Sequence, residues 1–188
     1  MRKLIYAINI TLDGCCDHTK MIPDEKDFEY HTQLLREADL FVYGRKTYQL
    51  MVPYWPDVAK DQSASKADRD FAQAFGSANK VVFSRSLDSA EAKKGDNNAR
   101  VVHTNLRDEI VKLKQEPGKN IIAGGVDIPS QLIELGLVDE YRFGISPVIA
   151  GAGRRLMEGV NLPEKLRLKL VDSKTLPSGW VMLRYLKQ

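Results

Sequence analysis

Three short segments of the sequence combine glycine, hydroxyl and basic residues directly after an apolar run. They are Gly44-Arg45-Lys46-Thr47, Ser84-Arg85 and Gly124-Gly125-Val126-Asp127. Glycine lets a backbone approach a ligand closely, a helix start offers free N–H groups, and Arg and Lys supply positive charge, so these residue types together are typical of phosphate binding. Each segment alone also fits an ordinary strand end or a tight turn, because short motifs often match by chance.

The apolar runs before these segments indicate where they would meet. If the runs are parallel strands of one sheet, their carboxyl ends lie at one edge, where ligands of open α/β folds bind. The sequence therefore predicts an extended ligand that carries phosphate. No G-x-G-x-x-G segment follows the first apolar run and no Walker motif occurs, so neither a Rossmann-type dinucleotide site nor a P-loop is supported.

Apolar runs of strand length recur along the chain, and several are nearly continuous, as in a sheet covered on both faces. They lie at Leu4 to Ile10, Leu40 to Tyr43, Lys80 to Phe83, Arg100 to His103, Asn120 to Ala123 and Tyr141 to Ile149. Helical periodicity occurs between them, for example at Phe28, His31 and Leu35. The alternation predicts an α/β fold with a mixed, mostly parallel sheet flanked by helices.

The last part of the chain has a different pattern. Apolar and basic residues alternate from Leu166 to Leu170, and a Pro-Ser-Gly turn precedes a second run from Trp180 to Leu186, which predicts a C-terminal antiparallel hairpin. No linker or repeat divides the chain, so we expect a single domain over residues 1–188. The Pro, Ser, Asp and Asn content of residues 52–68 and 88–99 predicts two long loops.

The composition argues against several classes of protein. The net charge of +3 is spread among interspersed acidic residues, which argues against a nucleic-acid partner. Asn9 and Asp13 interrupt the apolar start before a signal-peptide core forms, and no run reaches membrane-span length, so we expect a cytoplasmic protein with no membrane partner. We expect Cys15 and Cys16 to be free thiols, and no residues have the spacing of a metal site.

The order and spacing of these segments resemble the dihydrofolate-reductase-like family over nearly the whole chain. Ala7 on the first strand, followed by the three phosphate-type segments, resembles the successive NADPH contacts of dihydrofolate reductase. The second half is more similar to the reductase domain of riboflavin biosynthesis. That similarity lies in Gly124-Gly125, the run at residues 136–140 and the segment from Pro147 to Gly153. Near the start of the chain, Thr11-Leu12-Asp13-Gly14 also resembles the opening motif of that group.

The resemblance implies NADPH as the cofactor and assigns residues to it. Gly44, Arg45, Lys46 and Thr47 would hold the adenosine phosphates, with Ser84 and Arg85 near the ribose 2′-phosphate. Gly124, Gly125, Val126 and Asp127 would bind the pyrophosphate, and the nicotinamide would lie against Ala7 and the loop at Asp13 and Gly14. The riboflavin reductases usually carry a basic or small residue after the Asp-Gly pair, and Cys15-Cys16 in this chain argues against a ribosyl-pyrimidine substrate.

Four residues are candidates for the substrate side. Asp27, at the distance from Gly44 that suits the helix acid of dihydrofolate reductase, would be the catalytic pocket acid. The alternative for Asp27 is a first-turn acid favoured by the helix macrodipole. Tyr30, His31 and Trp55 would contact the substrate, although each also fits ordinary packing.

The resemblance implies an NADPH-dependent oxidoreductase of the dihydrofolate reductase or 5-amino-6-(5-phosphoribosylamino)uracil reductase type. It would transfer hydride to a small heterocycle, either a pterin or a pyrimidinone. A non-catalytic NADPH-binding protein and a basic surface-binding module remain as alternatives. We also expect a homodimer, paired through apolar edge strands at residues 141–145 and 180–183.

Overall fold

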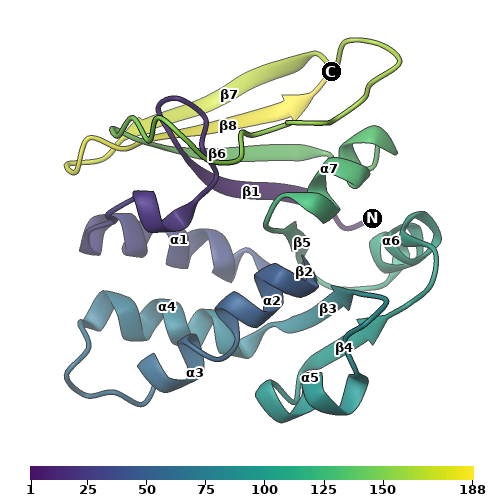
Figure 1. Ribbon diagram of the computed structural model, residues 1–188, viewed down its shortest axis with the longest axis horizontal. Coiled ribbons are helices and arrows are strands. Elements are labelled where there is room, and N and C mark those ends of the chain that lie inside the picture. The colour runs from purple at the N-terminus through teal and green to yellow at the C-terminus, as the bar shows by residue number, and fades with distance from the viewer.

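The computed structural model describes residues 1–188. An eight-stranded mixed sheet lies at its centre, with the strand order β4-β3-β2-β5-β1-β6-β8-β7 (Figure 1). The strands are β1 (Leu4–Thr11), β2 (Ala38–Gly44), β3 (Asn79–Phe83), β4 (Ala99–Val102), β5 (Asn120–Ala123), β6 (Glu140–Ser146), β7 (Leu168–Thr175) and β8 (Val181–Lys187). β1 through β6 pair in parallel, and β8 pairs antiparallel with both β6 and β7. The predicted α/β fold with its C-terminal hairpin is confirmed.

The edges of the sheet differ from the sequence prediction. Figure 1 shows β7 at one end of the sheet and β4 at the other. β6 lies between β1 and β8, and β8 lies between β6 and β7. The prediction that residues 141–145 and 180–183 form edge strands is therefore wrong, because the hairpin adds β7 outside β8. Tyr141 of β6 and Met182 of β8 are buried, and the other apolar residues of these two strands are half-buried.

Seven helices and a short 3₁₀ turn lie in the segments between the strands, mostly in crossovers between parallel strands. They are the 3₁₀ turn η1 (His18–Lys20), α1 (Glu25–Arg36), α2 (Arg45–Met51), α3 (Trp55–Val58), α4 (Lys66–Ser77), α5 (Ser89–Gly95), α6 (Leu106–Gln115) and α7 (Asp127–Glu134). Side chains of Asp24, Ser65 and Asn105 accept backbone N–H groups at the starts of α1, α4 and α6.

Both predicted long loops contain helices, so that prediction is wrong in part. α3 and the start of α4 lie within residues 52–68, and α5 lies within residues 88–99. The polar residues that indicated loops include helix caps. Ser65 caps α4 and Asp88 caps α5, each through a side-chain oxygen that accepts backbone N–H groups.

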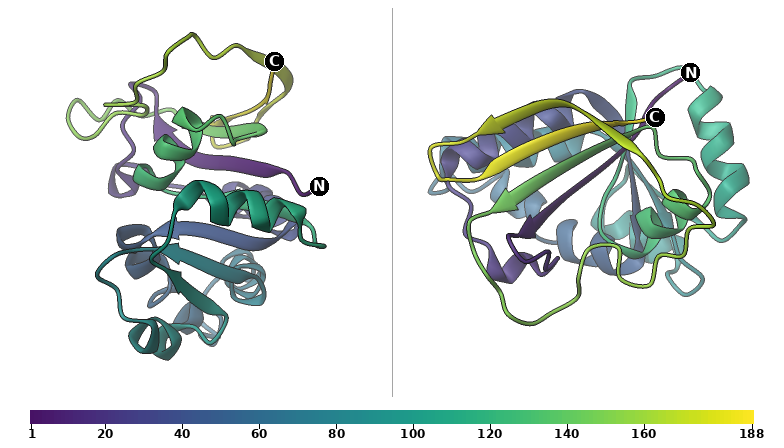
Figure 2. Two further views of the ribbon diagram at one scale, coloured as in Figure 1. Left: turned by 90° about the vertical axis from the view of Figure 1, so that its right-hand side faces the viewer. Right: turned by 90° about the horizontal axis from the view of Figure 1, so that it is seen from above.

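Helices cover the two faces of the sheet, and Figure 2 shows them on both sides. Alternate residues of β1 enter different cores, since successive strand side chains point to opposite faces. Ile5 joins the core that includes residues of α1, α2, α3 and α4, whereas Leu4 and Tyr6 join the core that includes residues of α6 and α7. None of the helices combines the length and apolar character that crossing a membrane requires.

The parallel strands place their carboxyl ends at one edge of the sheet. β2 ends at Gly44, β3 ends just before Ser84, and β5 ends just before Gly124. β2 pairs with both β3 and β5, so the three phosphate-type segments follow three adjacent strands. This arrangement agrees with the prediction that the segments lie along one edge.

Candidate functional site

A cavity of ≈ 370 Å³ opens at this edge of the sheet. One part, which we call the α7 end, is lined by residues of α2, of the turn between β5 and α7, and of the loop after β6, namely Lys46, Thr47, Gly124, Gly125, Val126, Asp127 and Arg154. The other part, which we call the α1 end, is lined by residues of β1, α1, β6 and β8, namely Ala7, Ile8, Asn9, Tyr30, His31, Leu34, Leu35, Arg142, Phe143, Gly144 and Met182. The cavity therefore joins a glycine turn to a mainly apolar chamber.

The α7 end brings together most of the residues predicted to bind phosphates. Gly125 packs against Thr47 so closely that a Cβ atom at Gly125 would collide with Oγ1 of Thr47, and its φ of +84° lies in the left-handed region. A Cβ atom at Gly124 would lie 2.7 Å from Cε1 of Tyr43. Tyr6 also holds the turn in place, because its hydroxyl donates a hydrogen bond to the carbonyl oxygen of Gly125 at 3.1 Å.

Helix α7 begins at this turn without a side-chain cap. The first backbone N–H groups of a helix have no partner within the helix, and the helix dipole makes this end attractive to anions. Lys46 lines the same end of the cavity and is exposed. The α7 end therefore offers backbone donors and two cationic side chains, Lys46 and Arg154, beside the carboxylate of Asp127.

Arg154 is a lining residue that the sequence analysis did not identify. Its Nη1 lies 2.5 Å from Oδ1 of Asp127, so an ion pair links the loop after β6 to the first residue of α7. Both side chains are about half exposed. Arg154 directly follows the Gly151-Ala152-Gly153 segment, but only the three-dimensional structure shows that this segment returns to α7.

Four predicted cofactor residues lie outside the cavity, along the same edge. Gly44 and Arg45 form the start of α2, and Arg45 is exposed. Ser84 uses its hydroxyl oxygen to accept the backbone N–H groups of Ser86 and Leu87. Arg85 is exposed beside it. An extended ligand that left the cavity over β2 and β3 would meet these residues next.

Asp13 and Gly14 hold two loops together and do not line the cavity. The Asp13 carboxylate accepts hydrogen bonds from the Thr11 hydroxyl and from the backbone N–H groups of Ala150 and Gly151, and it pairs with Arg155 at 2.7 Å. The hydrogen bond from Thr11, together with Arg155, holds the pKa of Asp13 well below its usual range. The pair thus anchors the loop after β1 to the loop after β6.

Asp27 is buried but lies outside the cavity lining. Its Oδ2 accepts the backbone N–H of Asp24 at 2.7 Å, which completes a capping box, and its Oδ1 accepts the Ser178 hydroxyl at 2.7 Å. Both carboxylate oxygens are therefore committed to the start of α1 and to the turn before β8. Asp27 is thus placed as a capping residue in the first turn of α1, and its role as a pocket acid stays a prediction.

Of the predicted substrate contacts, Tyr30 and His31 line the cavity and Trp55 does not. Trp55 is 9% exposed and packs against Phe28 and Phe71 in the core beside α4. Nε2 of His31 lies 3.1 Å from Nδ2 of Asn9, a residue that the sequence analysis did not select. Burial lowers the pKa of His31 to about 4, so its ring is neutral at pH 7.

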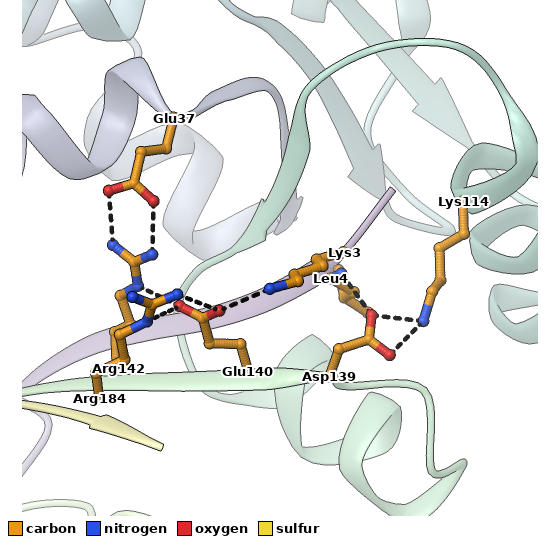
Figure 3. A network of polar contacts seen from close by, with 8 residues as sticks. All are labelled: Lys3, Leu4, Glu37, Lys114, Asp139, Glu140, Arg142 and Arg184. Carbon is orange, nitrogen blue, oxygen red and sulfur yellow. Dashed lines mark hydrogen bonds and ion pairs between the residues drawn. The ribbon is translucent and has the colours of Figure 1, made fainter. Parts of the chain in front are cut away.

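Arg142 is the charged residue of the α1 end, and Figure 3 shows it within a network of ion pairs. Its guanidinium donates to both carboxylate oxygens of Glu37 at 3.0 and 2.6 Å and to Oε1 of Glu140 at 2.6 Å. Burial acts to lower the pKa of Arg142, but the hydrogen bonds to Glu37 and Glu140 outweigh it and raise the pKa. Arg184 also pairs with Glu140, at 2.8 Å.

The fold and the cavity together define a protein of the dihydrofolate-reductase-like class. The RibD C-terminal domain family matches residues 2–182, and the chain belongs to this family. Two relatives from Bacillus subtilis are described as uncharacterized proteins. YyaP is 32% identical over 189 residues, which cover 98% of this chain and 94% of YyaP. YwjB is 27% identical over 179 residues, which cover 89% of this chain and 90% of YwjB.

Solved structures share the fold at low sequence identity. A putative riboflavin biosynthesis protein from Shewanella sp. PV-4 has a TM-score of 0.73 at 18% identity, with 99% of each chain covered. A diaminohydroxyphosphoribosylaminopyrimidine deaminase/5-amino-6-(5-phosphoribosylamino)uracil reductase from Thermotoga maritima has a TM-score of 0.66 at 15% identity, and the match covers 100% of this chain and 57% of the Thermotoga chain. The resemblance inferred from the sequence is thereby confirmed for family and fold.

Proposed function

We propose that this protein is an NADPH-dependent reductase that transfers hydride to a small heterocycle, either a pterin or a pyrimidinone. The observation that carries the proposal is the single cavity that joins the glycine turn at α7 to the chamber under α1. A cofactor and a substrate need such continuity, because hydride transfer requires direct contact between the reacting carbons. The reductase named in the Thermotoga structure supports the reaction class.

The α7 end fits a cofactor diphosphate. Side chains larger than hydrogen at positions 124 and 125 would collide with Tyr43 and Thr47, so the two glycines let the turn pack closely against β2 and α2. The start of α7 would donate N–H groups to the diphosphate, and Lys46 would balance its charge. Beyond the cavity, Arg45, Ser84 and Arg85 would meet the adenosine part of the cofactor.

The remaining residues of the cavity would orient the reactants and exclude water. When bound, the reduced nicotinamide supplies a hydride to an electrophilic carbon of the heterocycle, and the heteroatom of that double bond takes a proton from water. Ala7 has a small side chain, which leaves room for a flat ring against β1. Leu34, Leu50 and Phe71 line the cavity and would keep water from the reacting carbons.

The proposal is tested by measuring NADPH binding and turnover separately. Isothermal titration should give saturable binding of NADPH, and loss of nicotinamide absorbance with a panel of pterins and pyrimidinones should reveal a substrate. Failure to bind NADPH would overturn the proposal. Tight binding of NADPH without turnover on any member of the panel would favour the second candidate, a non-catalytic NADPH-binding protein, which the position of Asp27 outside the cavity also favours.

The choice of NADPH over NADH is tested at Arg85. A charge-assisted contact to the 2′-phosphate is worth roughly 1.5–3 kcal/mol, so Arg85→Ala should weaken NADPH binding about tenfold or more and leave NADH binding almost unchanged. Arg36→Ala is the control. This exposed residue is the last of α1 and lies near the amino end of β2, at the opposite edge of the sheet from Arg85. Equal weakening of both cofactors would instead give Arg85 a role in a shared phosphate contact or in the fold.

We also propose that the protein is a homodimer. Of the two edge strands, β7 carries exposed apolar side chains at Leu170 and Val171, which are 48% and 41% exposed. Unpaired strand edges with apolar side chains favour association with another chain. Light scattering at micromolar concentration should give twice the mass of one chain, and the mass of a single chain would overturn this part of the proposal.

A further inference from the structure

The charges around the α1 end constrain the substrate of the proposed reductase. Among its lining residues, Arg142 is the only one with a charged side chain. The other polar side chains there belong to Asn9, Tyr30 and His31, and Cys16 and His18 also line the cavity, from the segment after β1. Recognition of a charged substrate group at this end would therefore depend on Arg142.

Arg142 already directs its guanidinium to two carboxylates, one of which, Glu140, it shares with Arg184. Its guanidinium forms a two-point pair with Glu37, and its Nε donates to Glu140 (Figure 3). A phosphate that approached Arg142 would have to compete with Glu37 and Glu140 for guanidinium nitrogens that already donate to them. The α1 end is therefore poorly suited to a substrate with a phosphate group.

A cationic amidine is equally poorly matched. Pairing with such a group requires a carboxylate inside the cavity, and the α1 end has none. Asp27 of α1 is the carboxylate that the sequence suggested for this role, but its two oxygens accept hydrogen bonds from Asp24 and Ser178. A substrate that places a positive charge here would lose hydration without gaining a partner.

Asn9 offers a different kind of recognition. Because His31 is neutral, its Nε2 can accept a hydrogen bond from Nδ2 of Asn9, which fixes the plane of the amide. Gly144 lies beside Asn9 on β6, and a Cβ atom there would collide with Oδ1 of Asn9. Because residue 144 has no side chain, the Asn9 oxygen can occupy this space next to the cavity.

The amide of Asn9 keeps two groups for a ligand. It makes no other side-chain hydrogen bond within the chain, so its second N–H and its carbonyl oxygen remain available. One donor beside one acceptor matches the C(=O)–N–H edge of a heterocyclic lactam, which presents one acceptor beside one donor. The same pair does not match an amidine edge, which presents donors at both positions when protonated.

We infer that Asn9, held by His31 and given room by Gly144, recognises the lactam edge of an uncharged heterocycle that carries no phosphate. This inference rests on the proposed reductase function and specifies its substrate class. It excludes two kinds of substrate, namely a pterin that binds through a carboxylate of the protein and a phosphoribosyl pyrimidine.

A matched pair of ligands tests the lactam edge. The probes are 6,7-dimethylpteridine-2,4-dione and 2,4-diamino-6,7-dimethylpteridine, compared at a pH at which the diamine is protonated, so that they share a ring system and differ in the edge they present. Titration into protein saturated with NADP⁺ should show the dione binding at least tenfold more tightly. Asn9→Leu should weaken the dione tenfold or more and leave NADP⁺ affinity within twofold. Asn9→Asp should reverse the preference, because a carboxylate accepts from one amino group and from the adjacent protonated ring nitrogen.

A second pair tests the absence of phosphate recognition. 5-Amino-6-ribosylaminouracil should bind at least as tightly as its 5′-phosphate. The inference is overturned if the phosphate form binds tenfold more tightly, if wild-type protein prefers the diamine, or if Asn9→Leu binds the dione with unchanged affinity. Because NADP⁺ binding is measured independently in each variant, loss of the cofactor site would be recognised as failure of the proposed function itself.

Discussion

Thr47 of α2 and Gly125 of the turn before α7 pack against each other at the α7 end of the cavity, with no room between them for a Cβ atom on residue 125. The two residues belong to segments 78 positions apart in the chain, yet β2 and β5 are neighbours in the sheet. The contact therefore joins two of the three segments that the sequence marks as phosphate-binding.

Gly125→Ala should weaken NADPH binding tenfold or more, because the methyl group would displace Thr47 and shift the turn. It should also lower the free energy of unfolding by about 1–2 kcal/mol, since residue 125 has a left-handed backbone conformation. Gly151→Ala is a matched control, with a φ of +75° and no atom within 4 Å of the added Cβ. If both variants weaken NADPH equally, the effect is backbone strain and not the closed contact with Thr47.

Asp27→Ala should destabilise the protein without affecting NADPH binding. The carboxylate satisfies a backbone N–H at the start of α1 and the Ser178 hydroxyl, so its loss should cost about 1–3 kcal/mol in urea unfolding. Combining Asp27→Ala with Ser178→Ala should cost less than the sum of the two single changes, because they remove the same contact. An intact fold with turnover lost in Asp27→Asn would instead support the pocket-acid role.

The elements of this fold could be predicted because their signals are local. The run from Asn120 to Ala123 forms β5 with the predicted bounds, and Gly124-Gly125 follows it as the turn before α7. Apolar content and glycine placement depend only on neighbouring residues, so they indicate strands and turns from the sequence alone. The polar caps of α4 and α5 were ambiguous, because Ser and Asp favour both loops and helix starts.

The roles of single polar residues could not be predicted, because their partners are distant in the sequence. Asp27 meets Ser178, which lies 151 positions later, and Asp13 meets Ala150 and Gly151. Asn9 stood inside an apolar strand pattern, and nothing local distinguished it from any other strand residue. Its significance depends on His31 and Gly144, which reach it only through the packing of α1 and β6 against β1.

Glu140→Gln should be strongly destabilising. The Glu140 side chain is 1% exposed and lies between Arg142 and Arg184. Burial acts to raise its pKa, but the hydrogen bonds from Arg184 and Arg142 outweigh burial and lower the pKa. Removing this charge leaves two guanidinium groups close together, at a cost of about 3–5 kcal/mol in the free energy of unfolding.

Glu37→Gln is the matched control for that experiment. Glu37 pairs with the same Arg142, but its side chain is 45% exposed, so water can replace part of the contact. The expected loss is about 1 kcal/mol or less. A loss at Glu37 equal to that at Glu140 would contradict the view that burial of Glu140 makes the network important for stability.

His31 should make the stability of the fold depend on pH between about 4 and 6.5. Burial lowers its pKa from the ordinary 6.5 to about 4, so between these values the unfolded chain binds a proton at this residue and the folded chain does not. Acid therefore favours unfolding there, and His31 should contribute a loss of about 1.4 kcal/mol per pH unit as the pH falls through this window. Above pH 6.5 the residue is neutral in both states and adds nothing to the pH dependence of stability.

Urea unfolding of wild type and His31→Gln from pH 4.5 to 7.5 measures the contribution of His31, since glutamine does not titrate. Parallel curves for the two proteins would show that His31 protonates as readily in the fold as in the unfolded chain, and that Asn9 does not face a neutral ring at acidic pH.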